Sequence, residues 1–159
     1  MKIGIASDHA GFEMKDFLKK ELENDGYEII DYGPEIKKVV DYPDFAEKVA
    51  SGIIRKEIEF GILICGTGIG MSIAANKFKG IRAARCCTIY DALLARQHND
   101  ANILTLAGRL IGLPLSLEIA KTFLETPFLK GRHLRRVNKI KKIEKAEKLL
   151  RKESIFLSA

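Results

Sequence analysis

Short apolar segments alternate with amphipathic helical segments five times along the chain, and this alternation restricts the possible folds most strongly. We predict strands at 2–7, 28–32, 60–64, 81–86 and 102–106. Helices are predicted at 11–25, 43–56, 69–77, 89–98 and 113–124, and a long C-terminal helix at 134–152. The first, third and fourth strands lack polar alternation, which is typical of a parallel sheet covered on both faces. The pattern predicts an α/β fold: a three-layer α/β/α doubly wound (Rossmann-like) domain with a five-stranded parallel sheet.

The size and the cysteine content fit one globular domain in a reducing compartment. The 159 residues suit a single core, and no apolar run is long enough to span a membrane. Met1-Lys2 leads directly into the first strand, without the pattern of a signal peptide. The three cysteines are an odd number, which favours free thiols. We therefore expect a cytoplasmic protein that does not associate with a membrane.

The positive charge of the chain is concentrated near its C-terminus. The net charge is +6, and residues 130–152 hold eleven Lys or Arg against two Glu. Three interpretations remain open: a solvated helix face, an anionic-substrate site at the start of that helix, and a nucleic-acid contact. An apolar stripe on the same helix comprises Leu134, Val137, Ile140, Ile143 and Leu149-Leu150. Because a stripe needs burial, it favours packing on a partner subunit and argues against nucleic acid.

A Gly-rich loop, Cys65-Gly66-Thr67-Gly68-Ile69-Gly70, follows the third strand and opens a helix. The dinucleotide fingerprint requires a third Gly where Met71 stands, and a cysteine-phosphatase loop requires Arg at that position. A P-loop requires Gly-Lys-Ser/Thr, and the loop has no lysine. What remains is a thiol beside a hydroxyl at a helix start, where a base or nucleophile and oxyanion-stabilising N–H groups could act. The alternative is that Cys65 merely ends a buried strand.

Other polar residues follow strands at the expected carboxyl edge of the sheet. Asp8-His9 follows the first strand, and Gly108-Arg109 follows the fifth. If the first and third strands are neighbours, as in flavodoxin-like strand orders, Asp8-His9 and the Gly-rich loop share one crevice. Tyr42 lies beyond the second strand, where we expect core packing rather than a role in a pocket. Arg85 has no assigned role, and Cys86 and Cys87 are expected to be buried thiols rather than catalysts.

Two further polar clusters carry candidate side chains. The run Arg96-Gln97-His98-Asn99-Asp100 closes a helix, and His98 is either a helix-end residue or a proton-transfer group. Arg132 and Arg136 are four residues apart and share one helix face. This pair is either a phosphate clamp or part of a basic surface turn.

Taken together, these residues resemble the ribose-5-phosphate isomerase type B family (RpiB/LacAB). The match spans roughly residues 1–145 and rests on four motifs: Ser7-Asp8-His9-Ala10-Gly11, residues 65–77 (CGTGIGMSIAANK), residues 96–100 (RQHND), and Gly131-Arg132-His133 with Arg136. The resemblance implies one sugar-phosphate isomerase domain over 1–159, in which 144–159 is a C-terminal helical extension. It further implies interconversion of D-ribose 5-phosphate and D-ribulose 5-phosphate in the pentose phosphate pathway, without a metal or an organic cofactor.

The resemblance also assigns roles by position. Cys65 would be the base that moves a proton between C1 and C2 through an enediolate, which Thr67 and the loop N–H groups would stabilise. His98 and Asp8 would assist ring opening. The substrate-binding residues would be His9, Gly66, Gly68, Ile69, Gly70, Asn99, Arg109, Arg132 and Arg136, among which His9, Arg132 and Arg136 would hold the phosphate.

The resemblance also leads to expectations about the oligomeric state and the substrate. Members of the family are homodimers or dimers of dimers with sites shared between subunits, and we expect His98, Asn99 and Arg109 to come from the partner chain. Two alternatives to the pentose-phosphate enzyme remain. One is a hexose-phosphate isomerase that acts on galactose 6-phosphate or allose 6-phosphate, and the other is a non-enzymatic nucleic-acid-binding module.

Overall fold

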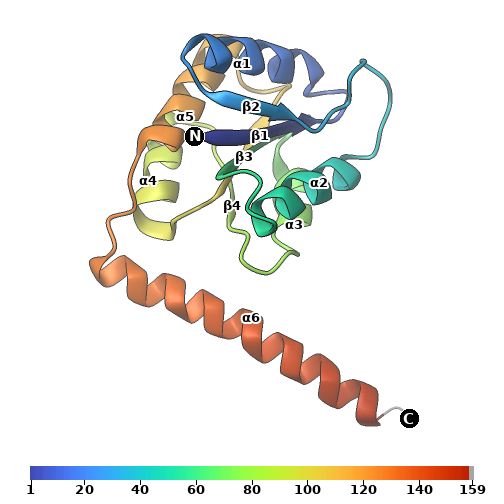
Figure 1. Cartoon of the computed structure of the whole chain (residues 1–159), viewed down its shortest axis with the longest axis vertical. Coiled ribbons are helices and arrows are strands. Elements are labelled where there is room, and N and C mark those ends of the chain that lie inside the picture. The colour runs from blue at the N-terminus through green and yellow to red at the C-terminus, as the bar shows by residue number, and fades with distance from the viewer. Residues whose placement is uncertain (158–159) are drawn as a thin grey trace.

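A computed structural model describes the backbone of residues 1–157 and the side chains of residues 1–146 (Figure 1). The strands are β1 (Lys2–Ser7), β2 (Glu28–Asp31), β3 (Phe60–Cys65), β4 (Ala83–Arg85) and β5 (Ile103–Ala107). The helices are α1 (Phe12–Asn24), α2 (Tyr42–Ile54), α3 (Ile69–Ala75), α4 (Ile89–Asn99), α5 (Leu113–Glu125) and α6 (Gly131–Leu157). Each predicted element is present, and the bounds of most differ from the prediction by one to three residues.

All strand pairs are parallel, and the strand order is β2-β1-β3-β5-β4. Helices α1, α4 and α5 cover one face of the sheet, and α2 and α3 cover the other (Figure 1). Along β3, Ile62 and Ile64 belong to one core cluster, whereas Leu63 and Cys65 belong to the other. A strand buried on both faces has no solvent side, which explains why its sequence lacks polar alternation. The predicted three-layer doubly wound fold is confirmed.

The strands β1 and β5, which lie on the two sides of β3, determine which loops meet. Ser7 at the end of β1 pairs with Ile64, and Ala107 at the end of β5 pairs with Cys65. The expected adjacency of the first and third strands is therefore confirmed. Strand β5 takes the other place beside β3, and β4 lies at the edge of the sheet. The loops after β1, β3 and β5 consequently lie side by side at the carboxyl edge of the sheet.

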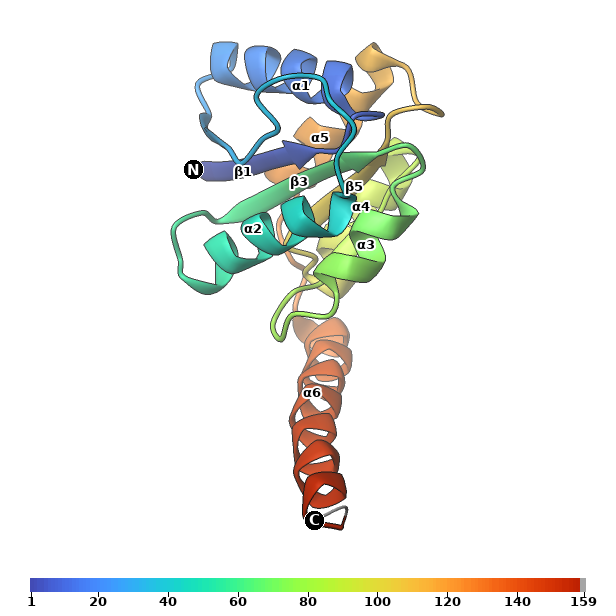
Figure 2. The ribbon, with the colours of Figure 1, turned by 90° about the vertical axis from the view of Figure 1, so that its right-hand side faces the viewer.

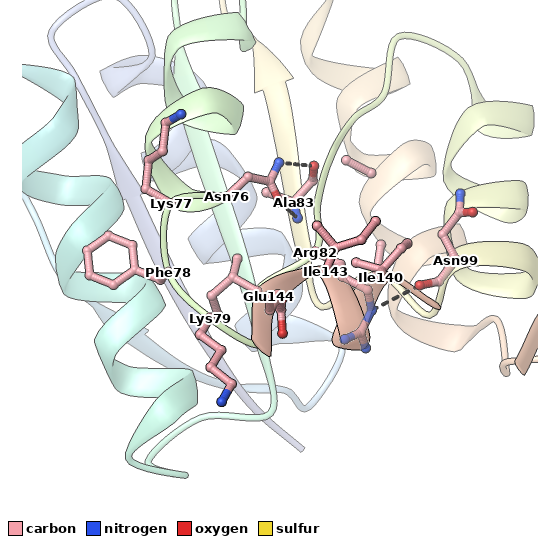
Figure 3. Close-up of a pocket in the computed structure, with 13 residues that line it drawn as sticks. Asn76, Lys77, Phe78, Lys79, Arg82, Ala83, Asn99, Ile140, Ile143 and Glu144 are labelled. Carbon is pink, nitrogen blue, oxygen red and sulfur yellow. Dashed lines mark hydrogen bonds between the residues drawn. The ribbon is translucent and has the colours of Figure 1, made fainter. Parts of the chain in front are cut away.

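The edge strand β4 is shorter than the predicted segment 81–86. Before the strand, the N–H of Ile81 bonds within a turn to Phe78, and the N–H of Arg82 bonds to the Asn102 side chain. On its outer side, the Asn76 side chain accepts the N–H of Ala83 at 2.8 Å and donates to the Ala83 carbonyl at 2.9 Å (Figure 3). Asn76 is also the C-cap of α3, so this helix ends two residues before the predicted position 77.

The C-terminal helix α6 extends away from the body of the domain (Figure 2). It begins three residues before the predicted position 134, because the Lys130 carbonyl accepts the N–H groups of His133 and Leu134. Of the predicted apolar stripe, Val137 is buried, whereas Leu134, Ile140 and Ile143 are exposed. Leu149 and Leu150 lie outside the residues whose side chains are described. In the described part of the chain, no helix is both long enough and apolar enough to cross a membrane.

A buried lysine joins α1 to the segment that follows β2. Lys15 is 1% exposed, and its Nζ donates to Asp31 Oδ2 at 2.8 Å and to the Pro34 carbonyl at 3.0 Å. Lys19 reaches the same carboxylate oxygen at 3.2 Å from a partly buried position. Burial by itself raises the pKa of Asp31, but Lys15, the Gly33 N–H and Lys19 together hold it below its usual value. The chain leaving β2 is thus fixed by a compensated buried charge.

We predict that Lys15→Met lowers the free energy of unfolding by about 2 kcal/mol, because the half-buried Asp31 loses its closest cation. Lys19→Met is the matched control, since it removes a contact to the same oxygen from a more exposed lysine and costs about 0.5 kcal/mol. Urea unfolding followed by circular dichroism measures both changes. Equal losses in the two variants would contradict the importance of burial here.

Candidate active site

Three loops are joined by backbone hydrogen bonds at the carboxyl edge of the sheet. The N–H of Asp8 donates to the Ile64 carbonyl at 3.0 Å, which ties the loop after β1 to β3. The N–H of Gly108 donates to the Cys65 carbonyl at 2.8 Å, and that of Arg109 donates to Gly66 at 3.2 Å. Asp8-His9 and the Gly-rich loop are therefore neighbours, as predicted, and the loop after β5 joins them; we refer to this junction of three loops as the crevice.

The loop after β1 is shaped by the carboxylate of Asp8. Asp8 is buried, and its Oδ1 accepts the N–H groups of Ala10 at 2.8 Å and Gly11 at 3.0 Å. A Cβ at Gly11 would lie 2.6 Å from the Ile64 carbonyl oxygen, so only glycine allows this approach. The neighbouring His9 has a buried Nδ1 without a protein partner among the described residues. Such a nitrogen is available to a ligand.

The Gly-rich loop folds back over the thiol of Cys65. Cys65 is 4% exposed, and its Sγ accepts the N–H of Gly68 at 3.2 Å. Gly68 adopts a φ of +74°, and a Cβ there would meet the Leu106 carbonyl at 3.1 Å. The Thr67 hydroxyl accepts the N–H of Ile69 at 3.4 Å. The predicted arrangement of a thiol, a hydroxyl and a helix start at one point is therefore present.

Tyr42 contacts this loop from α2. A Cβ at Gly70 would lie 2.6 Å from the Tyr42 ring, so the ring rests on the glycine. Tyr42 is 39% exposed, which makes the expectation of core packing wrong. The physical reason is that Tyr42 is the first residue of α2, so it lies at the end of the helix near the carboxyl edge rather than in the core.

Two arginines border the same loop. Arg85 Nε donates to the Thr67 carbonyl at 2.6 Å, a contact that sequence reasoning missed because it depends on the turn at Gly68. The Arg109 side chain lies against Gly66, with its Cδ 3.4 Å and its Nε 3.6 Å from the position of a Cβ there. Arg109 thus lies beside the crevice of its own chain. The expectation that a partner supplies Arg109 to a shared site stays a prediction.

The remaining predicted site residues gather at the opposite edge of the sheet. Helix α4 runs back from the carboxyl edge, so His98 and Asn99 lie at the amino edge, near the start of α6. The rings of His98 and His133 stack with centroids 4.1 Å apart and an interplanar angle of 4°. Arg132 Nε approaches His133 Nε2 at 3.3 Å. Within one chain, the crevice and this amino-edge cluster are separated by the length of a strand, about 17 Å for the five residues of β5.

Asn99 also borders a cavity of about 610 Å³ between α6 and residues 76–84 (Figure 3). Arg82 and Ala83 line it from the edge of the sheet, and Ile140 and Glu144 line it from α6. The Glu144 carboxylate accepts the N–H of Gly80 at 3.1 Å, which ties α6 to this connection. Asn99 is the only predicted site residue among the residues that line this cavity.

The other cysteines do not contribute to the crevice. Cys65, Cys86 and Cys87 are all free thiols. Burial, followed by the charge of Asp91 and the thiol of Cys87, raises the pKa of Cys86 to about 12. Cys86 is therefore a buried, neutral thiol, as predicted, whereas Cys87 is only partly buried. Among the described residues, no group of three or more His, Cys, Asp or Glu side chains is placed to hold a metal ion.

The sequence profile of the Ribose/Galactose Isomerase family matches residues 3–140. The chain belongs to this family. Ribose-5-phosphate isomerase B of Escherichia coli is 46% identical over 143 residues, which cover 90% of this chain and 96% of that protein. The family assignment makes the chain an enzyme, an aldose–ketose isomerase.

Solved structures of related isomerases have the same fold. A ribose 5-phosphate isomerase of Thermotoga maritima is 56% identical with a TM-score of 0.87, covering 89% of this chain and 97% of that one. Ribose-5-phosphate isomerase B of Clostridium thermocellum is 52% identical with a TM-score of 0.91, covering 92% and 99%. The enzyme of Mycoplasma genitalium, solved with bound ribulose 5-phosphate, is 42% identical with a TM-score of 0.87, covering 91% and 96%.

The environment of His133 links the stability of this isomerase to pH. His133 is 5% exposed. Burial, together with the nearby His98, Arg132 and Arg136, lowers the pKa of His133 below its ordinary value. The folded chain therefore binds this proton less readily than the unfolded chain does. Stability is fully present above the ordinary pKa of histidine and declines as the pH falls below about 6.5.

We predict that the melting temperature falls by a few degrees between pH 7 and pH 5.5, because His133 resists protonation in the folded state. His133→Gln flattens this dependence, since glutamine does not titrate. Thermal melts followed by circular dichroism at closely spaced pH values test the prediction. An equally steep dependence in the variant would assign the effect to other groups.

Proposed function

We propose that this chain interconverts D-ribose 5-phosphate and D-ribulose 5-phosphate by a 1,2-proton shift through an enediolate. The observation that carries the proposal is the junction of Asp8, the Cys65 loop and Arg109 at one crevice. The family membership and the names of the relatives support the same reaction. An isomerisation of this kind needs a base, a stabiliser for the developing oxyanion and an anchor for the phosphate.

Cys65 is the base in this proposal. Its thiolate removes a proton from C2 of the open-chain aldose, which leaves an enediolate with its charge on O1. The hydroxyl proton passes from O2 to O1, and the thiol returns its proton to C1 to give the ketose. The sulfur lies at the carboxyl end of the central strand, where the Gly68 N–H holds it under the loop. Cys86 is a poor alternative, because its burial keeps the thiol protonated.

The Gly-rich loop stabilises the enediolate. The Thr67 hydroxyl lies on the exposed side of the loop, and the first N–H groups of α3, from Gly70 and Met71, have no carbonyl partner within their own helix. Donors that are fixed before the reaction stabilise the oxyanion without reorganisation. Gly66, Gly68, Ile69 and Gly70 bind substrate mainly through their backbone, which suits residues with small or outward-pointing side chains.

Ring opening and phosphate binding use both edges of the sheet. Asp8 and His98 assist opening of the furanose ring, with Asp8 supplied by the crevice and His98 by the end of α4. The phosphate is held by His9, whose unpartnered Nδ1 is available, and by Arg132 and Arg136. Arg109 and Asn99 add polar contacts. No metal ion and no organic cofactor takes part in the proposed reaction.

A complete site then requires two copies of the chain. The crevice and the amino-edge cluster are about 17 Å apart within one chain, too far for one small substrate to contact both. We propose a homodimer or a dimer of dimers in which each crevice receives His98, Asn99, Arg132 and Arg136 from the partner. Helices α3 and α4, which flank the edge strand β4, support this arrangement because they expose large apolar side chains: Ile69, Ile73, Ile89 and Tyr90.

The proposed enzyme is one isomerase domain over 1–159, with 144–159 as a helical extension. The family match ends at residue 140, which supports a separate role for the extension. We propose a cytoplasmic enzyme of carbohydrate metabolism that binds neither nucleic acid nor a membrane. The apolar residues Leu134, Ile140 and Ile143 on α6 favour a protein partner for this helix over nucleic acid.

We predict that Cys65→Ala and His98→Gln each lower turnover of ribose 5-phosphate at least about a hundredfold, because each removes a proton-transfer group. When the two variants are refolded together in equal amounts, activity returns to roughly a quarter of wild type, since half of the dimers regain one of two sites. A coupled assay for ribulose 5-phosphate measures the recovery. Cys86→Ala is the matched control and retains turnover.

Two results would count against these assignments. Near-wild-type turnover of Cys65→Ala would show that another group is the base. Failure of the mixture to recover, with both variants folded and dimeric by circular dichroism and sedimentation, would show that each chain holds its own site. The two failures are separate, because the first concerns the chemistry and the second concerns the assembly.

A hexose-phosphate isomerase is the second candidate, because the matching family includes galactose isomerases. We predict that kcat/KM for ribose 5-phosphate exceeds that for allose 6-phosphate and galactose 6-phosphate by at least about tenfold. Tyr42, which rests on Gly70 at the border of the loop, limits the space for a longer sugar. Coupled assays with the three substrates decide between the candidates, and a clear hexose preference would replace the pentose assignment.

A further inference from the structure

An ionic cluster outside the crevice holds the end of α4. Asp100 follows the helix in the left-handed conformation, with a φ of +48°. Its Oδ2 accepts from Arg82 at 2.8 Å, and its Oδ1 accepts from Arg96 at 3.0 Å. One carboxylate therefore bridges two guanidinium groups, and each of these groups has further partners.

Arg82 binds the backbone that carries the predicted site residues. Its Nε donates to the carbonyl of Asn99 at 3.0 Å (Figure 3). The same Nε donates to the carbonyl of Asp100 at 2.8 Å. The last carbonyls of a helix have no partner within the helix, so Arg82 satisfies two groups that would otherwise face solvent. Because Arg82 directly precedes the edge strand β4, the end of α4 is fixed to the sheet itself.

Arg96 anchors the cluster to the core. It is 7% exposed, and its guanidinium carbon lies 4.7 Å from the Phe60 ring centroid and 5.8 Å from that of Phe123. The same side chain donates to the carbonyl of Ala101 at 2.6 Å and to that of Thr126 at 3.3 Å. The charge is therefore buried beside two aromatic rings, and its Nε and Nη1 donate to three acceptors.

This cluster is more elaborate than a helix end requires. Glycine alone is the usual residue for a left-handed position after a helix, and it needs no ionic partners. A partly buried ionic network of this kind adds little net stability over apolar packing, but it fixes geometry, since each charge must keep its partners. The element fixed in this way carries His98 and Asn99, the residues assigned to the partner's crevice.

We propose that Arg82, Arg96 and Asp100 are positioning residues that aim His98 and Asn99 into the active site of a second subunit. The inference rests on the proposed shared site. Arg82 fixes the backbone at Asn99, and the stack on His133 fixes the ring of His98. A displacement of about 1 Å at a proton-transfer group is enough to lower turnover about a hundredfold.

The test uses Asp100→Asn, which keeps the size and the left-handed conformation but replaces one accepting oxygen with a donor. We expect kcat/KM to fall about 10- to 100-fold, while the dimer remains folded. The decisive readout is complementation. When mixed with Cys65→Ala, Asp100→Asn recovers roughly a quarter of wild-type activity, because one site then combines an intact crevice with an intact α4 end.

The matched control is a mixture of Asp100→Asn with His98→Gln. Both defects then lie on the same half of the site, so no activity is recovered. If Asp100→Asn does not fold, Arg82→Lys replaces it in both mixtures. This variant keeps the positive charge but loses the Nε that reaches both carbonyls.

Three outcomes would overturn the inference. The first is near-wild-type activity of Asp100→Asn or Arg82→Lys. The second is an impaired variant that recovers no activity when mixed with Cys65→Ala, while the mixture of Cys65→Ala with His98→Gln does recover activity. This result would place the defect in the crevice or in general stability. The third is failure of the Cys65→Ala and His98→Gln pair itself, which would remove the shared site and is recognised separately by that mixture.

Discussion

Parallel pairing of the strands is the constraint on which the rest of this structure depends. Because every strand points the same way, the loops after β1, β3 and β5 meet at one edge, and Asp8, Cys65 and Arg109 come together there. The same constraint sends each connecting helix back to the opposite edge. His98 at the end of α4 is therefore separated from Cys65 by the fold itself, and neither loop flexibility nor side-chain rotation can close that distance.

The sequence predicted the layers and the crevice because both follow from local pattern. Unbroken apolar runs such as 60–64 identify strands buried on both faces, and a Gly-rich loop after such a strand identifies the carboxyl edge. The place of β5 beside β3 could not be predicted, since strand order depends on how crossover helices pack. The contact of Arg109 with Gly66 of its own chain depends on this strand order, so the sequence could not predict it.

Contacts made through backbone carbonyls were equally hidden from sequence reasoning. Arg85 and Arg82 each donate to carbonyl groups, at Thr67 and at Asn99, and any residue can supply a carbonyl. No motif therefore marks the acceptor. Tyr42 was misjudged for a related reason: its partner is Gly70, whose missing side chain makes room for the ring. Such contacts become visible only when turns such as that at Gly68 are known.

The side chain of Asn76 has a consequence for how copies of this domain can associate. Its amide occupies both the donor and the acceptor of Ala83 on the open side of β4. An incoming strand would need those same two groups to continue the ladder, so the sheet cannot be extended there by simple edge-to-edge pairing. The β4 edge of the sheet is in this way protected against aggregation by strand pairing. At this edge, copies of the domain can associate through the side chains of helices instead.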